Sequence, residues 1–223
     1  MVLLEKKVGA MREYKKGMIS AIFSGKLRFK DENGNPYPDW EEKRLGDVIA
    51  KNSQKNKNNE INFVQSVSNI YGFVAQEDLF EDRIVASDNL RNYYVIKRGT
   101  FAYNPSRIDV GSLAYKSDNN TSVVSPLYVS FRANNRFLVD GFLFAWFKSN
   151  DFQKQMHNSF EGSVRNTLNY FALSSMKIKL PSLIEQQKIA DFLSAIDHKI
   201  ELEQTRLDRT KDFKKGLLQR MFV

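Results

Sequence analysis

The chain carries the stretch PSLIEQQKIADFL at residues 181–193, which marks the start of a long helix. Ser182 and Glu185 have the spacing of a capping box, in which the hydroxyl and the carboxylate each satisfy backbone N–H groups of the first turn. After the opening proline of this stretch the chain has no further proline and a single glycine, Gly216. We therefore predict one continuous helix over residues 182–223.

Apolar residues in this helix recur in a seven-residue pattern. Such spacing favours a coiled coil, because a 3.5-residue repeat keeps an apolar line facing a partner helix. A helix of about 40 residues spans on the order of 60 Å, which is longer than a compact domain of this size. We predict a projecting arm with a helix interface, the alternative being an amphipathic helix folded on its own domain. The interface residues are Ile189, Ile196 and Leu217 on one heptad position and Leu193, Ile200, Leu207 and Met221 on another.

An internal repeat links the two ends of the chain. Residues 14–19 (YKKGMI) return at 213–218 (FKKGLL), and residues 22–23 (IF) return at 221–222 (MF), with the same offset of 199 positions. Self-similarity at a fixed offset marks a repeated structural unit. We infer that the chain opens with the tail of one unit and closes with the tail of the next. Each unit is then a globular segment followed by a helix.

The opening segment has the pattern of a second, shorter helix. Leu4, Met11 and Met18 lie seven residues apart, and Gly25 stands where a glycine commonly ends a helix. The sequence therefore divides into three parts, which are an N-terminal helix over residues 1–25, a globular domain over 26–181 and a coiled-coil helix over 182–223.

The globular part combines helix and strand signals. Residues from Val139 to Met156 predict one amphipathic helix that places its aromatic residues on one face. We expect an α+β fold, in which one mixed domain is flanked by the two terminal helices. Short β-branched and aromatic runs predict its strands at residues 63–64, 93–96, 100–103, 113–115, 127–131 and 176–180.

Composition narrows the classes of function. The 223 residues are 42% apolar and 13% aromatic, which describes a folded protein. The absence of cysteine excludes disulfides, thiol nucleophiles and cysteine-ligated zinc. The first residues lack the apolar core of a signal peptide and no apolar run reaches the ~20 residues of a membrane span, so we expect a cytoplasmic protein. Its 34 basic and 26 acidic side chains give a net charge of +8, which favours a polyanionic partner through counterion release.

Residues suited to catalysis are scarce. His157 and His198 are the only histidines, and no metal-binding motif surrounds either of them; the sequence also lacks a P-loop and a dinucleotide-binding glycine motif. We therefore expect no metal and no cofactor. Asp31 followed by Glu41 and Lys43 has the residue order of metal-dependent nucleases, whose carboxylates bind Mg²⁺. A small nuclease is thus the enzymatic alternative, although the pattern falls in a predicted linker.

Two loops carry side chains suited to reading nucleic acid, one at residues 99–107 and one at 162–167. Arginine is the best bidentate reader of guanine and asparagine of adenine, and serine commonly holds a phosphate. The alternatives are that these side chains only close turns, or that a basic interaction protein binds without sequence preference. The predicted contacts to double-stranded DNA are Arg83, Arg91, Asn92, Tyr103, Asn104, Ser106, Arg107, Lys116, Arg165 and Asn166.

Four stretches of the chain carry a family resemblance. They are residues 180–200, which include EQQKIA and IDHKI, the segment DWEEKRLGDV at 39–48, the loop at 104–111, and GSVR at 162–165. On these residues the chain resembles the specificity subunits of type I restriction–modification enzymes. The stretches span nearly the whole chain, and EQQKIA after a proline is highly specific.

The resemblance implies a non-catalytic subunit for DNA recognition. Members of the family pair two target recognition domains with conserved helices, so that each domain reads one half of a split site and the helices act as a ruler. Methyltransferase subunits dock on the helices, and motor-endonuclease subunits cut unmethylated DNA. This sequence has one recognition domain, so it either pairs with itself as a homodimer or is half of a two-domain chain. A symmetric pair would read a palindromic split site.

Overall fold

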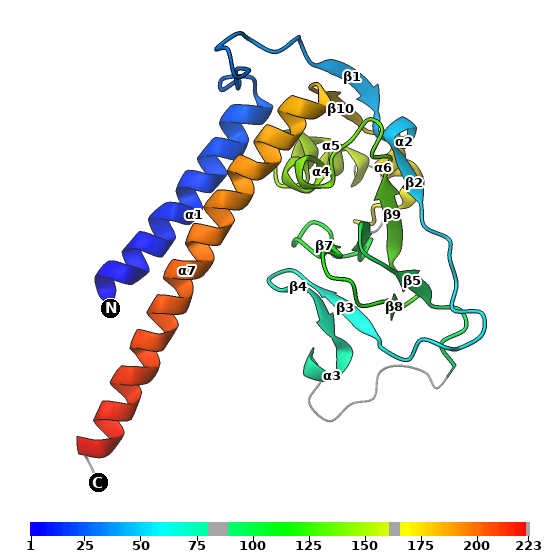
Figure 1. The fold of residues 1–223 in the computed structure, drawn as a ribbon. Helices are drawn as coiled ribbons and strands as arrows, with labels where there is room; N and C mark the ends of the chain where they lie inside the picture. The colour runs from blue at the N-terminus through cyan, green and yellow to red at the C-terminus, as the bar shows by residue number, and fades with distance from the viewer. Residues whose placement is uncertain (80–88, 161–165, 222–223) are drawn as a thin grey trace.

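A computed structural model describes residues 1–79, 89–160 and 166–221. Two helices, α1 (Val2–Phe23) and α7 (Leu183–Met221), lie side by side and project from a globular part that holds the strands (Figure 1). They run antiparallel, since Lys7 pairs with Glu203 and Lys15 with Asp197. The continuous closing helix is confirmed. No helix in these described ranges is both long and apolar enough to cross a lipid bilayer.

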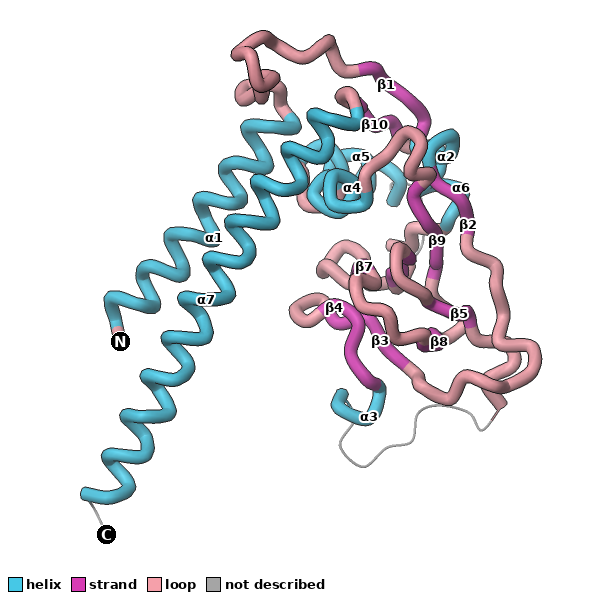
Figure 2. Tube along the Cα trace, in the orientation of Figure 1, coloured by secondary structure: helices cyan, strands magenta, loops and turns pink. Residues whose placement is uncertain are grey.

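Short strands and helices build the globular part, and the predicted α+β class is confirmed (Figure 2). The antiparallel four-stranded sheet has the order β2 (Ile49–Lys51), β9 (Val129–Ala133), β6 (Thr100–Tyr103), β7 (Leu113–Tyr115). Antiparallel ribbons pair β1 (Glu41–Arg44) with β10 (Lys177–Leu180), β3 (Gln65–Ser68) with β4 (Gly72–Ala75), and β5 (Tyr94–Ile96) with β8 (Ser122–Val124). The shorter helices are α2 (Leu45–Val48), α3 (Gln76–Leu79), α4 (Asp140–Trp146), α5 (Asn150–Phe160) and α6 (Tyr170–Ser175).

The ribbon of β1 and β10 joins the two ends of the globular part. Its register pairs Glu41 with Leu180 and Arg44 with Lys177, and the N–H of Leu45 donates to the carbonyl of Met176 at 2.8 Å. The segment that leaves α1 therefore lies beside the strand that enters α7. Both helices of the arm are attached to the globular part at the same place (Figure 1).

The core continues from the globular part into the base of the helix pair. Phe101 and Phe131 stack on neighbouring strands with ring centroids 5.2 Å apart, and Phe147 packs against Phe131 at 5.9 Å. Ile22 of α1 and Ile189 of α7 are fully buried in the same cluster. The arm is therefore anchored by apolar burial as well as by chain connectivity.

Some predicted element bounds are wrong for local reasons. The helix predicted from Val139 to Met156 is two helices, because α4 ends at Trp146 and Ser149 caps the start of α5. Its hydroxyl accepts the N–H of Phe152 at 3.2 Å, which is typical of a serine at a helix start. The strand predicted at 127–131 begins at Val129, and the one at 63–64 is replaced by β3.

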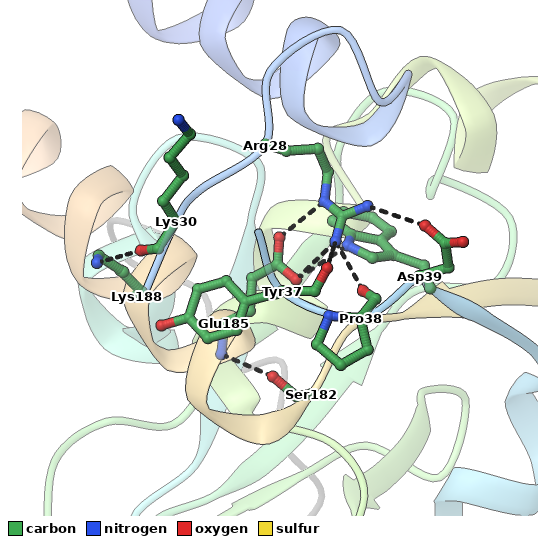
Figure 3. A network of polar contacts seen from close by, with 9 residues as sticks. Arg28, Lys30, Tyr37, Pro38, Asp39, Ser182, Glu185 and Lys188 are labelled. Atoms are coloured by element: carbon green, nitrogen blue, oxygen red, sulfur yellow. Dashed lines mark hydrogen bonds and ion pairs between the residues drawn. The ribbon is translucent and has the colours of Figure 1, made fainter. Parts of the chain in front are cut away.

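Glu185 does not complete the predicted capping box. Ser182 does accept the N–H of Glu185 at 3.3 Å, but the carboxylate turns to the segment after α1 (Figure 3). It accepts from Arg28 Nε at 2.9 Å, Arg28 Nη2 at 3.2 Å and Trp40 Nε1 at 3.2 Å. Its side chain is fully buried, whereas that of Arg28 is 30% exposed. A buried two-pronged ion pair thus clamps the first turn of α7.

Gly141 marks the closest approach of α4 to α7. A Cβ at this position would lie 2.9 Å from the Cβ of Ala190, closer than two carbon atoms can pack. We expect Gly141→Ala to lower the free energy of unfolding by about 1–3 kcal/mol through overpacking, measured by urea denaturation. Adding Ala190→Gly should restore most of the loss. Gly17→Ala, which has nothing within 4 Å, serves as the control and should not destabilise. If Gly141→Ala leaves the free energy of unfolding unchanged, α4 and α7 can move apart without loss of stability.

Candidate nucleic-acid interface

The first predicted reading loop joins β6 to β7. The side-chain oxygen of Asn104 accepts the N–H of Ser106 at 3.0 Å, and the N–H of Arg107 donates to the carbonyl of Asn104 at 3.0 Å. Ile108 is buried and ties the loop to the core, while Ser106 and Arg107 are exposed. Asn104 therefore closes this turn. The same two hydrogen bonds hold Ser106 and Arg107 at an exposed tip.

The structure brings the described end of the second predicted loop close to the first. The N–H of Leu168 donates to the carbonyl of Pro105 at 3.0 Å, and the hydroxyl of Tyr103 donates to the carbonyl of Leu168 at 3.0 Å. Asn166, two residues before Leu168, is exposed. Asn104, Ser106, Arg107 and Asn166 thus come from loops that share these two hydrogen bonds. Arg165 lies outside the described residues.

Two predicted DNA contacts are buried instead. Tyr103 is fully buried, and this burial raises the pKa of its hydroxyl, which remains a donor to the second loop. Lys116 is 1% exposed and donates to Gln65 Oε1 at 2.7 Å, with Asp118 Oδ2 at 3.0 Å. Neither side chain reaches the surface. Tyr103 positions the loops and Lys116 anchors strand β3.

Two further predicted contacts lie on another segment of the chain. Arg91 and Asn92 are exposed on the separate segment that leads into β5, where the carbonyl of Asn92 accepts Lys55 Nζ at 2.7 Å. Arg83 lies outside the described residues. The candidate surface therefore centres on the first loop and on Asn166.

A hollow of about 250 Å³ lies beside the first loop, and the sequence did not predict its opposite wall. Asn104 and Arg107 line one side. The other side is the ribbon of β3 and β4, with Tyr128 from the segment before β9. Gly72 ends the turn of this hairpin with a positive φ of +70°. A glycine at such a position is a sequence signal for a hairpin turn. The ribbon residues that line the hollow are Ser66, Val67, Ser68 and Asn69.

A larger hollow lies elsewhere in the described part of the chain. It measures about 530 Å³ and is lined by Trp40, Trp146 and Lys154 among others, where α1 and α5 meet the ribbon of β1 and β10. None of the predicted reading residues in the described part of the chain lines it. We place the candidate site at the first loop and Asn166, where several of the side chains predicted to read bases come together.

The residues of the nuclease alternative are used in other ways. Asp31 Oδ1 accepts the N–H groups of Asn33 and Asn35 at 2.9 and 2.7 Å, which closes the turn after α1. Glu41 pairs with Lys43 at 3.2 Å on β1, a strand rather than the predicted linker. Within the described ranges no three acidic or histidine side chains gather as metal ligands.

Most residues of the predicted helix interface are buried against other elements of the same chain. Ile189, Leu193, Ile196 and Leu207 are buried, and Ile200 packs half-buried on the same core. Leu217 is 45% exposed, and the side chain of Met221 lies outside the described part. The physical reason is that α1 and α4 pack on this face of α7. The predicted seam therefore cannot serve a partner along its whole length.

A different face of α7 is free in this chain. Leu202 is 56% exposed and Phe213 is 68% exposed, eleven residues or three turns apart, and Leu217 follows one turn later. We call Leu202, Phe213 and Leu217 the α7 stripe. Arg206 and Arg209 line the same groove as Leu202 and Phe213.

The repeat gives the end of α7 a packed counterpart. Ile19 of α1 is 4% exposed in the domain core, whereas Leu218, which stands 199 positions later, is 44% exposed. The same sequence pattern is thus covered at one end of the chain and bare at the other.

Comparison with known proteins gives consistent matches. The family model "Type I restriction modification DNA specificity domain" matches residues 37–211. The chain is 25% identical over 197 residues to the type I restriction enzyme HindI specificity subunit of Haemophilus influenzae, covering 83% of this chain and 41% of that protein.

Solved structures show the same fold. The HsdS subunit from Thermoanaerobacter tengcongensis matches with a TM-score of 0.55 and 18% identity, over 92% of this chain and 47% of that one. The type I restriction–modification S subunit from M. genitalium matches with a TM-score of 0.62 and 15% identity, over 96% of this chain and 55% of that one. The chain therefore spans about half the length of the proteins that it matches.

Proposed function

Because the chain belongs to the family of type I restriction–modification DNA specificity domains, we propose that it reads one half of a split double-stranded DNA site. Residues 26–181 act as the target recognition domain. The observation that carries this proposal is the tie between the two reading loops at Pro105 and Leu168, which places Arg107 and Asn166 on one surface.

The arm serves as the ruler and the assembly surface. The 39 residues of α7 span about 58 Å, more than one ~34 Å turn of duplex, so a second recognition unit on the arm leaves unread base pairs between the half-sites. That second unit is another copy of this chain or the other half of a longer one, and it docks at the α7 stripe. Methyltransferase subunits and the motor-endonuclease subunit supply the chemistry, and this chain is non-catalytic.

Replacing Arg107 by alanine should weaken binding to the cognate duplex by about 1–3 kcal/mol, because a bidentate arginine distinguishes guanine from other bases. The site is first selected from random duplexes with the purified full chain, and affinities are then measured by fluorescence anisotropy at fixed salt. The variant should also accept other bases at one position of the site.

Arg136→Ala is the matched control, since it removes an equally exposed arginine outside the two loops. It should lower affinity for all duplexes alike and leave the selected site unchanged. Equal effects of the two variants would contradict the reading role of the loop. A wild-type chain with no preference among duplexes would support the basic interaction protein, and Mg²⁺-dependent cleavage of bound DNA would support the nuclease.

A further inference from the structure

The ribbon of β3 and β4 ends in an exposed apolar tip. Ile70 is 75% exposed and Tyr71 is 76% exposed, and both belong to the three-residue turn between Ser68 and Gly72. Figure 2 shows this ribbon at the opposite end of the globular part from the ribbon of β1 and β10. Two large apolar side chains held side by side in water are typical of a contact surface.

Hydrogen bonds within the ribbon hold the backbone of the tip. Ser68 Oγ accepts the N–H groups of Ile70 and Tyr71 at 3.2 and 3.3 Å. At the base of the ribbon, the fully packed Gln65 Oε1 accepts from Lys116 Nζ and Ser122 Oγ, both at 2.7 Å. This buried polar cluster explains why a lysine lies in the interior of the domain. It fixes the ribbon to β7 and β8, so that the tip needs little ordering when it binds.

The tip also lies beside the first reading loop. A Cβ on Gly111 would lie 3.7 Å from the Cβ of Asn69, and Ser112 Oγ donates to the carbonyl of Val67 at 3.4 Å. Asn69 of the tip and Arg107 of the first loop line the same hollow of about 250 Å³. The apolar tip and the arginine are therefore parts of one continuous surface.

We propose, on the premise of the DNA-binding function above, that the β3–β4 ribbon enters the major groove and that Ile70 and Tyr71 read a thymine methyl group. The major groove accommodates a two-stranded ribbon, and the C5-methyl of thymine is the apolar feature that it presents. Arg107 flanks the ribbon, where it contacts the adjacent base pair or phosphate. The tip is thus a specificity-determining element that supplies apolar readout beside polar readout.

The test couples a protein change to a change in the DNA. In the site selected for the wild-type chain, each thymine is replaced in turn by deoxyuridine, which lacks only the methyl group. At one position the wild-type affinity should fall about fourfold, the value for one buried methyl group. The variant Ile70→Ala/Tyr71→Ala should bind the normal site about tenfold more weakly and should lose nothing further at that deoxyuridine.

Ile184→Ala is the matched control, because Ile184 is 71% exposed at the start of α7, and it should keep the wild-type response. Thermal melting checks that all variants are folded. If the wild-type chain selects a defined site but the double variant binds and discriminates in the same way, the ribbon inference is overturned and the DNA-binding function stands. Equal deoxyuridine losses in both proteins overturn the methyl readout. If the wild-type chain selects no site, the proposed function itself is wrong.

Discussion

Replacing Arg28 by alanine is expected to lower the free energy of unfolding by about 3–5 kcal/mol, one of the two largest effects that we predict. The change leaves the fully buried carboxylate of Glu185 without a counter-charge, with only the Trp40 indole N–H as a donor. An uncompensated charge inside a protein is far more costly than a pair that is absent altogether. The affected joint holds the first turn of α7 to the segment that follows α1 (Figure 3).

Urea denaturation of the full chain measures this effect, and three further variants locate its cause. Arg28→Met combined with Glu185→Met should recover most of the stability, because it removes the stranded charge. The free energy of unfolding of Arg28→Lys should lie between those of the wild type and Arg28→Ala, because an ammonium cannot reproduce the two-pronged contact. Arg12→Ala removes an exposed arginine from α1 and should change stability by no more than about 0.5 kcal/mol. A double variant as unstable as Arg28→Ala would contradict the electrostatic explanation.

Elements with strong local signals were predictable from the sequence. The helix after Pro181 has a capping serine and no interruption by proline, and the structure confirms it as α7. The strand at 100–103 was predicted from its run of β-branched and aromatic residues and is β6. The single helix predicted from Val139 to Met156 was wrong for a local reason as well. Ser149 caps a new helix inside an otherwise regular apolar pattern.

Tertiary partners were not predictable in the same way. The sequence allows Glu185 to form either a capping box or an ion pair. The ion pair forms because the fold places Arg28 within reach of Glu185. A heptad pattern likewise shows that a face is apolar but not which element covers it. In this chain α1 and α4 cover the face that holds Ile189, so the free face of α7 had to be found in the structure.

The candidate site shows the same division. The residue types in the loop at 104–107 indicated nucleic-acid chemistry, and the structure exposes Ser106 and Arg107. Composition could not show that Lys116 is interior, because a lysine in a basic chain is usually on the surface. The ribbon tip at residues 69–71 was missed because two exposed apolar residues have no distinctive spacing in the sequence.

The second large effect is expected at the far end of the arm. Glu5 near the start of α1 pairs with Lys211, and α7 continues from there to Met221 (Figure 1). The end of α7 therefore projects beyond its partner helix and carries Phe213 and Leu217 of the α7 stripe uncovered. If two copies pair along this stripe, two-fold symmetry places each of these side chains in the interface twice.

Changing both Phe213 and Leu217 to aspartate should therefore weaken self-association at least a hundredfold, or about 2.8 kcal/mol, and leave a monomer at micromolar concentration. Four carboxylates would face one another where apolar surface was buried, so lost burial and like-charge repulsion act together. Sedimentation velocity over a concentration series measures the change. Ile184→Asp places the same charge on an exposed position at the other end of α7 and should leave the dimer intact. A wild-type chain that stays monomeric over the whole concentration series would contradict self-pairing and point to a second unit within a longer chain, because the stripe would then require a partner that a copy of this chain does not provide.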